Sequence, residues 1–458
     1  MAVWSVVKVS ALSPDMRLDA EYYKPNLLDL VRQLAGMKAR PWGELDGRFV
    51  VGPFGSDFNV ENFVEESSYR YIRGKDVKPF FVQDNDNVYM PEHFYAELKK
   101  YALFAGDLLV SVVGTLGNCA VVTEDVGDAV FSCKSTAWRP DNGIDDFPLY
   151  LTTYLNSRIG QSFLQRLPRG HIQTGLNLDD LKSIPIVEPA HSQVKQIALM
   201  VRGAHDARRD AKDALAAAEK LLLAALGLDH IDLSPSRSYS RTFKDLLAGR
   251  RFGAEYYMPC KQRALDALAK LPNKTLLYHA PNIREMWDPA SAGHGVMVRN
   301  FDLGDALEPF LDDTKNPVTA SEVGSTKKKF QAGDVVVSRL RSYLKEIAVV
   351  RTGNAMPSVG SSEFIVLRPT GRGLSAEAIL VFLRCPLVQT ILKWSQDGSN
   401  HPRFDEDDMI ALPVPDRLME VSAKIERHVH DAISARQEAA RLLEQAKQTV
   451  EDMIGGTA

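Results

Sequence analysis

Short apolar runs alternate with helical patterns along both halves of this 458-residue chain. In the first half, β-rich runs such as 107–113 are bounded by Gly, Asn and Asp, and an apolar period close to that of a helix follows over 149–167. The second half repeats this order, with an apolar run at 335–340 and a helical period over 377–394. The pattern therefore predicts an α+β chain made of two similar units.

Sequence matches between the halves indicate that the similarity is a duplication. Residues 17–25 (RLDAEYYKP) return as residues 251–259 (RFGAEYYMP). From the first predicted helix onward the offset stays constant, so that Gly170 corresponds to Gly398. Because the matches keep both order and spacing, we expect two copies of one structural unit.

The copies differ between these shared positions. The segment 170–175 (GHIQTG) stands opposite 398–403 (GSNHPR). Residues that fix cores and turns are kept while loop residues change, which is typical of one scaffold that recognises two different ligands. The divergent loops are therefore the first place to look for recognition chemistry.

An alanine-rich helical stretch follows each unit, with apolar residues at alternating intervals of three and four. Such spacing over four heptads predicts a coiled coil, and alanine at the contacts allows two helix axes to approach closely. We expect the two stretches to pair antiparallel; two separate amphipathic helices, each packed on its own unit, are the alternative. The predicted contact positions are Ile197, Met200, Ala204, Ala207, Ala211, Ala214, Ala218 and Leu221, followed by Ile425, Ala432, Ala435, Ala439, Leu442 and Ala446, with His428 and Thr449 as polar exceptions.

The order of these segments divides the chain into four parts. We expect a first unit over 1–190, a central spacer helix over 191–228, a second unit over 229–417 and a C-terminal spacer helix over 418–458. If the helices pair antiparallel, an approximate twofold axis relates the two units. At 1.5 Å per residue, a helix of roughly 33 residues spans about 50 Å.

Composition restricts the classes of function. The formal net charge is −4, so the surface as a whole does not favour nucleic acid, although basic residues gather at 325–351. The four cysteines are far apart and form no CxxC pair, which predicts neither a disulfide framework nor a thiolate zinc site. The first residues lack the features of a signal peptide, and no apolar run approaches the roughly 20 residues that cross a bilayer, so a cytoplasmic protein is expected.

Catalytic motifs are not found in the sequence. An adenine methyltransferase needs a glycine-rich cofactor turn and an Asn/Asp-Pro-Pro-aromatic run, and Asn316-Pro317-Val318 lacks the second proline and the aromatic residue. His428 and His430 lie two apart on a predicted helix and so point to different faces, which argues against a metal pair. We expect no catalytic residue, metal or cofactor in this chain. A protein-binding scaffold that never touches DNA stays open as an alternative, and a stand-alone enzyme is a weaker one.

The doubled order of several short motifs resembles the specificity (S) subunit of type I restriction-modification enzymes over nearly the whole length. These motifs are Gly52-Pro53-Phe54-Gly55-Ser56, Tyr71-Ile72-Arg73-Gly74-Lys75-Asp76, the Ala-Gly-Asp strands at Ala105 and Ala332, the strand ends Arg139-Pro140 and Arg368-Pro369, and the exits Ile184-Pro185 and Leu412-Pro413. The resemblance implies two target-recognition domains, each followed by a long helix, with the two helices as antiparallel spacers.

The same resemblance implies a non-catalytic reader of double-stranded DNA. Each domain is expected to read one half of a split, asymmetric site, and the helices to set the number of unread base pairs between the halves. Two methylation (M) subunits, which use S-adenosylmethionine, are expected to bind the helices and modify adenine at N6. Restriction (R) subunits are a further expected class of partner, and a membrane is not.

Candidate DNA contacts come from the divergent loops and the strand ends beside them. Their side chains suit phosphate contact or matching to base edges, although a plain surface or loop-closing role is the alternative for each. In the first unit the candidates are Lys134, Ser135, Arg169, His171, Gln173 and Thr174, and in the second Arg339, Arg341, Ser342, Lys345, Gln396, Asn400 and Arg403.

Overall fold

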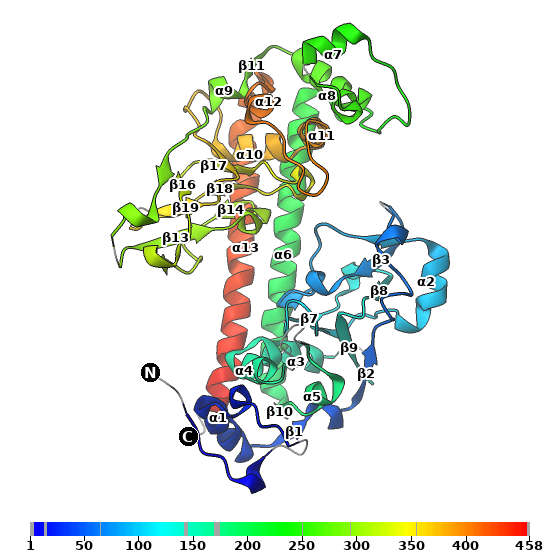
Figure 1. Ribbon diagram of the computed structural model, residues 1–458, viewed down its shortest axis with the longest axis vertical. Helices are drawn as coiled ribbons and strands as arrows, with labels where there is room; N and C mark the ends of the chain where they lie inside the picture. The colour runs from blue at the N-terminus through cyan, green and yellow to red at the C-terminus, as the bar shows by residue number, and fades with distance from the viewer. Residues whose placement is uncertain are drawn as a thin grey trace. The chain divides into compact units, whose positions relative to one another are not determined.

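The computed structural model describes residues 4–12, 16–64, 66–141, 145–168, 175–249, 251–293, 295–353 and 355–455 (Figure 1). The chain forms two compact units. Unit 1 consists of Met1–Asp206 and Glu438–Ala458, and unit 2 consists of Ala207–Gln437. Each unit is described by itself.

Unit 1 contains a five-stranded sheet and a three-stranded sheet. Its strands are β2 (Gly47–Val51), β3 (Tyr69–Ile72), β4 (Phe80–Phe81), β5 (Tyr89–Met90), β6 (Leu108–Ser111), β7 (Cys119–Val121), β8 (Ala129–Phe131) and β9 (Ser135–Pro140). The larger sheet has the order β2, β9, β6, β7, β4, with β4 and β7 parallel and the other neighbours antiparallel. In the smaller sheet, β3 lies between β5 and β8 and runs parallel to β8.

Helices pack against both sheets of unit 1. They are α1 (Pro25–Ala35), α2 (Glu92–Leu98), α3 (Phe147–Asn156), α4 (Arg158–Arg166) and α5 (Leu178–Lys182), and a two-stranded sheet pairs β1 (Ala39–Pro41) with β10 (Pro185–Val187). Leu151 and Leu155 of α3 share one apolar core with Leu108 and Val110 of β6. Burial of this apolar surface is the main force that holds α3 on the sheet.

Unit 2 repeats these layers. Its strands are β11 (Asn273–Thr275), β12 (Met286–Trp287), β13 (Met297–Phe301), β14 (Phe310–Leu311), β15 (Val318–Thr319), β16 (Lys327–Phe330), β17 (Val335–Ser338), β18 (Ile347–Val350), β19 (Ser358–Gly360), β20 (Phe364–Leu367) and β21 (Pro413–Pro415). Its short helices are α7 (Phe243–Gly249), α8 (Pro259–Ala269), α9 (Leu276–His279), α10 (Ala376–Arg384), α11 (Pro386–Lys393) and α12 (Glu406–Ile410). Strands β14, β18, β17 and β20 form one sheet in that order, and β12, β16, β19, β13 and β15 form a second.

Strand pairing confirms the duplication predicted from the sequence. β6 lies antiparallel between β7 and β9, as β17 lies between β18 and β20. β4 runs parallel to β7, as β14 does to β18, and β3 runs parallel to β8, as β13 does to β19. β1 pairs with β10 and β11 with β21 in the same antiparallel manner. The chain is therefore α+β with two copies of one unit.

Each helix predicted as continuous over 149–167 and 377–394 is two helices, so that part of the prediction is wrong. Ser157 is extended, with φ −70° and ψ 164°, and its side chain accepts a hydrogen bond from the Gly160 amide at the start of α4. In the second unit, Cys385 is extended because Pro386 follows it and disfavours the helical region at the preceding residue. The apolar period continues through both breaks because both helices of each pair face one core.

Two long helices, α6 (His191–Leu226) and α13 (Arg417–Gly455), pack together as predicted. In unit 1 the first part of α6 meets the last part of α13, where Ile197 shares a core with Ala446 and Val450. In unit 2 the last part of α6 meets the first part of α13, where Leu222 shares a core with Ile425. Early residues of one helix thus face late residues of the other, which is an antiparallel arrangement.

Burial along these helices agrees with every second predicted contact position and differs at the positions between them. The residues at seven-residue spacing are buried: Ile197, Ala204, Ala211, Ala218, Ile425, Ala432, Ala439 and Ala446. The intermediate predicted positions are half-buried: Met200, Ala207, Ala214, Leu221, Ala435 and Leu442. Val201 and Leu222, which follow Met200 and Leu221, are buried instead, and so are Val429 and Val450, which follow the polar exceptions His428 and Thr449. His428 and Thr449 therefore stand beside the buried row, which runs through the valine after each of them.

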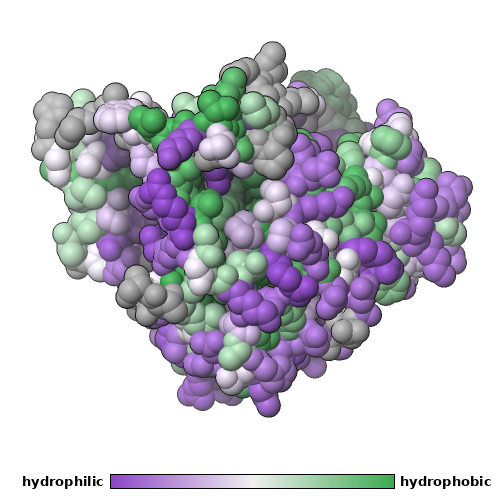
Figure 2. Space-filling model, turned by 90° about the horizontal axis from the view of Figure 1, so that it is seen from below, coloured by the Kyte–Doolittle hydropathy of each residue, from purple (hydrophilic) through white to green (hydrophobic). Residues whose placement is uncertain are grey.

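The described residues contain no helix long and apolar enough to cross a membrane. On the face shown in Figure 2, hydrophilic residues predominate and hydrophobic ones form smaller patches among them.

Candidate nucleic-acid interface

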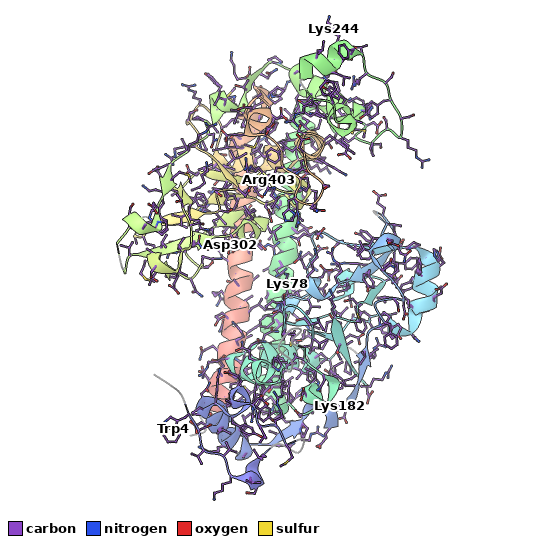
Figure 3. All side chains as sticks on the ribbon, viewed as in Figure 1. Trp4, Lys78, Lys182, Lys244, Asp302 and Arg403 are labelled. Atoms are coloured by element: carbon purple, nitrogen blue, oxygen red, sulfur yellow. The ribbon has the colours of Figure 1, made fainter. Side chains whose placement is uncertain are left out.

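Three segments of unit 2 that are far apart in sequence meet at one end of strands β17 and β20. The Arg339 amide donates to the Glu363 carbonyl at 3.2 Å, and the Phe404 amide donates to the Arg339 carbonyl at 3.2 Å. Asp397 and Arg403 exchange two backbone hydrogen bonds of 2.8 and 2.9 Å, which close the segment between them. Arg403, labelled in Figure 3, lies on the chain that follows α11. The structure thus brings the predicted residues Arg339 and Arg403 together.

Glu363 joins the two guanidinium groups. Its carboxylate lies 2.7 Å from Arg339 Nε and 3.0 Å from Arg403 Nη2. These bonds, that from Arg403 first, lower the pKa of Glu363. The arginine side chains remain 43% and 41% exposed, so each keeps N–H donors for an external acceptor. Guanidinium groups held in this way suit phosphate oxygens or the O6 and N7 acceptors of guanine.

Two further predicted residues, Arg341 and Lys345, lie in the same loop with left-handed backbone conformations. Their φ angles are 50° and 53°, and they flank a short 3-10 turn over Ser342–Leu344. The Arg341 amide donates to the Pro402 carbonyl at 2.9 Å, which ties this loop to the segment before Arg403. Such a conformation is uncommon for arginine and lysine and persists where surrounding contacts hold it, as at binding loops.

The remaining predicted residues of unit 2 differ in their accessibility. Gln396 Nε2 donates to the Pro402 carbonyl at 3.5 Å, and the Asn400 carbonyl accepts from Arg341 Nη2 at 3.4 Å. Asn400 is exposed. Ser342 is buried, and its hydroxyl has no hydrogen-bond partner among the described residues, so it is not presented at this surface.

Unit 1 builds the same backbone arrangement with different side chains. The Val112 amide donates to the Lys134 carbonyl at 2.9 Å, as Arg339 does to Glu363, and the Leu176 amide donates to the Val112 carbonyl at 3.0 Å. Val113 and Gly175 form the bridge that Leu340 and Arg403 form in unit 2. Val112, Lys134 and Gly175 thus occupy the places of Arg339, Glu363 and Arg403. An exposed cation replaces the central carboxylate.

The surroundings of Lys134 show what the backbone permits there. A Cβ on Gly74 would lie 2.7 Å from Lys134 Cβ, so only glycine allows this close approach. Ser135 is fully buried and its hydroxyl does not face solvent. Arg169, His171, Gln173 and Thr174 lie outside the described residues.

Phe54, which sequence reasoning used only as part of a motif, is 79% exposed, and its loop packs beside Cys133 through Gly55.

Sequence reasoning also missed a buried ion pair at the opposite end of the same strands. Arg139 Nε lies 2.8 Å from Asp107, and Arg368 Nε lies 2.7 Å from Asp334. Both aspartates are buried. Recurrence of Asp and Arg at matching places in the two copies was the available signal. The pair fixes the sheet and leaves the loop end free to vary.

One cluster in unit 2 has the composition of a metal site. Glu377 of α10 and Glu426 and His430 of α13 each place one ligand atom within 4.8 Å of the others. Arg351 Nη1 lies 3.5 Å from the Glu377 carboxylate, and His430 Nε2 lies 3.2 Å from it. The guanidinium already neutralises this carboxylate and opposes a second cation. The four-residue spacing of Glu426 and His430 was the sequence signal, since it places them on one helix face.

Comparison with known proteins finds restriction-enzyme specificity subunits. No protein-family model matches the chain. The specificity subunit of the type I restriction enzyme EcoBI from Escherichia coli is 26% identical over 129 residues, which is 27% of this chain and 27% of that relative. The type I S subunit from M. genitalium covers 90% of this chain and 95% of its own, with 11% identity and a TM-score of 0.40. The HsdS subunit from Thermoanaerobacter tengcongensis covers 92% and 94%, with 14% identity and a TM-score of 0.26.

Proposed function

We propose that this chain is the DNA-recognition subunit of a type I restriction-modification complex. Each unit reads one half of a bipartite, asymmetric site, and the chain performs no chemistry itself. Partner methylation subunits, with S-adenosylmethionine, methylate adenine at N6, and restriction subunits cleave. The partial sequence similarity to the E. coli specificity subunit supports this assignment.

The observation that carries the proposal is one backbone scaffold with two sets of side chains. Hydrogen bonds between the same three segments recur in both units, yet Arg339, Glu363 and Arg403 stand where Val112, Lys134 and Gly175 stand. A structural loop closure needs only the backbone bonds, which are kept. The side chains on this backbone differ between the units, and this difference supports contact of each unit with a different DNA sequence.

Local charge supports DNA as the ligand in spite of the acidic total. Two of the three segments that converge in unit 2 supply the cations: Arg339, Arg341 and Lys345 come from one, and Arg403 from the other. The third segment supplies Glu363, the one acid among the described residues within hydrogen-bond distance of Arg339 and Arg403. Phosphate contacts by such cations supply most non-specific affinity and make it fall steeply with salt. Donor pairs of arginine then discriminate guanine from other bases by roughly 1–3 kcal/mol per contact.

We further propose that the paired helices set the spacing between the half-sites. α6 has 36 residues and α13 has 39. At 1.5 Å per residue, α6 is about 54 Å long, which corresponds to roughly 16 base pairs of duplex. Their mostly small, buried contact residues allow the close helix packing that a stiff spacer needs.

Mapping of N6-methyladenine across the genome of the host, with and without this chain, tests the function. We expect a split motif that loses methylation on deletion and regains it on complementation. An unchanged methylation map in a host whose partner methyltransferase is active would contradict the assignment. Exchange of one unit for that of a relative should alter one half of the motif, and alteration of both halves would refute the one-unit-one-half scheme.

A further inference from the structure

The arginine that opens the repeated nine-residue segment holds the same place in both units. Arg17 donates from Nη1 to the Leu167 carbonyl at 3.0 Å and from Nη2 to the Pro168 carbonyl at 3.3 Å. Arg251 donates from Nη1 to the Ser395 carbonyl at 3.0 Å. These carbonyls lie one or two residues after the ends of α4 and α11, where the chain enters the divergent segments.

The surroundings of the two arginines also recur. The Tyr23 hydroxyl donates to the Arg17 carbonyl at 3.0 Å, and the Tyr257 hydroxyl donates to the Arg251 carbonyl at 2.8 Å. Each guanidinium lies over the ring of the preceding tyrosine, 4.5 Å from the Tyr22 centroid in unit 1. The corresponding distance from Arg251 to the Tyr256 centroid is 4.6 Å. Cation–π contact and a hydrogen-bonded backbone thus fix where each guanidinium points.

A second cation supports each tyrosine ring from a different part of the sequence. Arg166 lies 3.7 Å from the Tyr22 centroid, and Lys261 lies 3.3 Å from the Tyr256 centroid. Lys261 is buried, and burial lowers its pKa to about 8. The chemistry of the contact is kept although the residue that supplies it has changed. Such replacement indicates that the position of the tyrosine and its arginine matters in both units.

In unit 2 the contacts of Arg251 bracket the candidate DNA-binding segment. Besides Ser395, the guanidinium lies 3.2 Å from Asp397 and forms an ion pair with Asp405. It therefore contacts carboxylates on both sides of the turn that Asp397 and Arg403 close. The Arg251 side chain is only 18% exposed, whereas the Asp397 and Asp405 side chains are 76% and 69% exposed, so the guanidinium is the fixed partner of these ion pairs. A guanidinium has five donors in a rigid planar fork and can hold several acceptors in a fixed geometry, whereas the three donors of a lysine ammonium have no such fixed plane.

We propose that Arg251 is a positioning residue that fixes the segment 396–404 and thereby sets the orientation of Arg403. Arg17 plays the corresponding part in unit 1 through its bonds to the Leu167 and Pro168 carbonyls. The anchoring of the segment follows from the contacts alone, whereas its consequence for DNA reading rests on the proposed function. The arginine of the repeated RxxAEYYxP segment thus binds the chain just after α4 in unit 1 and just after α11 in unit 2.

Hydrogen–deuterium exchange on the full chain with its methylation partner tests the anchor without DNA. Arg251→Ala should raise exchange of the 396–404 amides by about tenfold or more, because opening no longer breaks the charged bonds to Asp397 and Asp405. Arg251→Lys should give a smaller increase. Arg263→Ala, which removes another arginine that binds backbone carbonyls in unit 2, is the matched control and should leave the segment unchanged.

Exchange of strand β17 and β18 amides in the same samples separates loosening of the segment from general unfolding. Unchanged exchange over 396–404 in Arg251→Ala, or an equal rise in β17 and β18, would overturn the proposal. Methylation assays then test the consequence: Arg251→Ala should lose selectivity for one half-site, and Arg17→Ala for the other. Faster exchange with full selectivity would overturn the positioning role. Absence of selective methylation in the unmutated complex would instead overturn the proposed function.

Discussion

At the scale of single residues, Glu363 is the acidic group at the centre of the candidate interface in unit 2. It lies between Arg339 and Arg403 and holds both through charge-assisted hydrogen bonds. Sequence reasoning selected the two arginines from their basic character and overlooked the acid, because an acidic residue is not expected at a DNA surface. Only the meeting of three distant segments shows that this carboxylate orients its neighbours.

Glu363→Gln should therefore separate affinity from selectivity. Loss of one negative charge should strengthen binding to any duplex, whereas loss of the ion pairs should reduce discrimination of the target half-site by about tenfold. Titration of specific and scrambled duplexes at several salt concentrations, with the methylation partner present, measures both effects. Glu420→Gln removes an equal charge from an exposed position of unit 2 and should leave discrimination intact. Equal changes in affinity and discrimination in both variants would show that Glu363 acts only through the net charge.

The same residue should contribute to the pH dependence of stability. Its folded pKa is lowered, so its contribution is fully present above the ordinary value of 4.5 and is lost as pH falls from there through the lower folded value. Thermal melts of the wild-type protein and Glu363→Gln should therefore differ at neutral pH and converge as the pH falls through this window. A constant difference at all pH values would contradict the assigned ion pairs. Partial exposure of the group keeps the effect small.

Arg403→Ala tests the partner arginine directly. If Arg403 contacts a base, the variant should lose roughly 1–3 kcal/mol of binding to the correct half-site and relax selectivity at one position. An equal loss on every duplex would mark a phosphate contact instead. Competition binding with single-base variants of the half-site distinguishes the two results, and no loss on any duplex would remove Arg403 from the interface.

At the scale of elements, the helix pair is the best-predicted feature and also shows the limit of pattern reading. The seven-residue repeat of Ile197 and the following alanines is visible in sequence and buried in the structure. The intermediate row could not be read reliably, because apolar residues stand at neighbouring positions such as Met200 and Val201. Which of two adjacent apolar residues faces the other helix depends on side-chain packing. The spacing of apolar residues in the sequence does not contain this information.

Ala211→Leu should destabilise the protein by overpacking the helix pair. Ala211 is fully buried, so three added carbon atoms must displace their neighbours at a cost of about 1–3 kcal/mol. Ala216→Leu makes the same change at an exposed position of α6 and is the matched control. Chemical denaturation followed by circular dichroism gives the free energy of unfolding of each variant. A loss no greater than that of the control would argue against close packing at Ala211.

At the scale of the whole molecule, duplication explains both what the sequence revealed and what it concealed. Recurrent Gly, Pro and apolar residues made the two units visible, since these residues fix turns and cores in each copy. The hydrogen bonds between Val112 and Lys134, and between Arg339 and Glu363, join backbone groups, so they do not require particular residue types that a sequence would show. The scaffold of the candidate interface could therefore be recognised only from coordinates.

Insertion of one heptad at corresponding points of α6 and α13 tests the proposed spacer. Seven residues add about 10 Å to a helix, so the unmethylated gap of the split motif should grow by about three base pairs. Sequencing of methylated DNA from a host that carries the insertion measures the gap. An unchanged gap in an active complex would show that the helices do not set the spacing.

The buried ion pairs of Asp107 with Arg139 and of Asp334 with Arg368 stabilise one end of each unit, while residues at the other end differ between the units. They secure β6 with β9, and β17 with β20, at the end remote from the divergent loops. Substitutions in the divergent loops therefore do not remove these ion pairs. Under the proposed function, a new target half-site can therefore evolve by substitutions in the loops of one unit while the fold of that unit is kept.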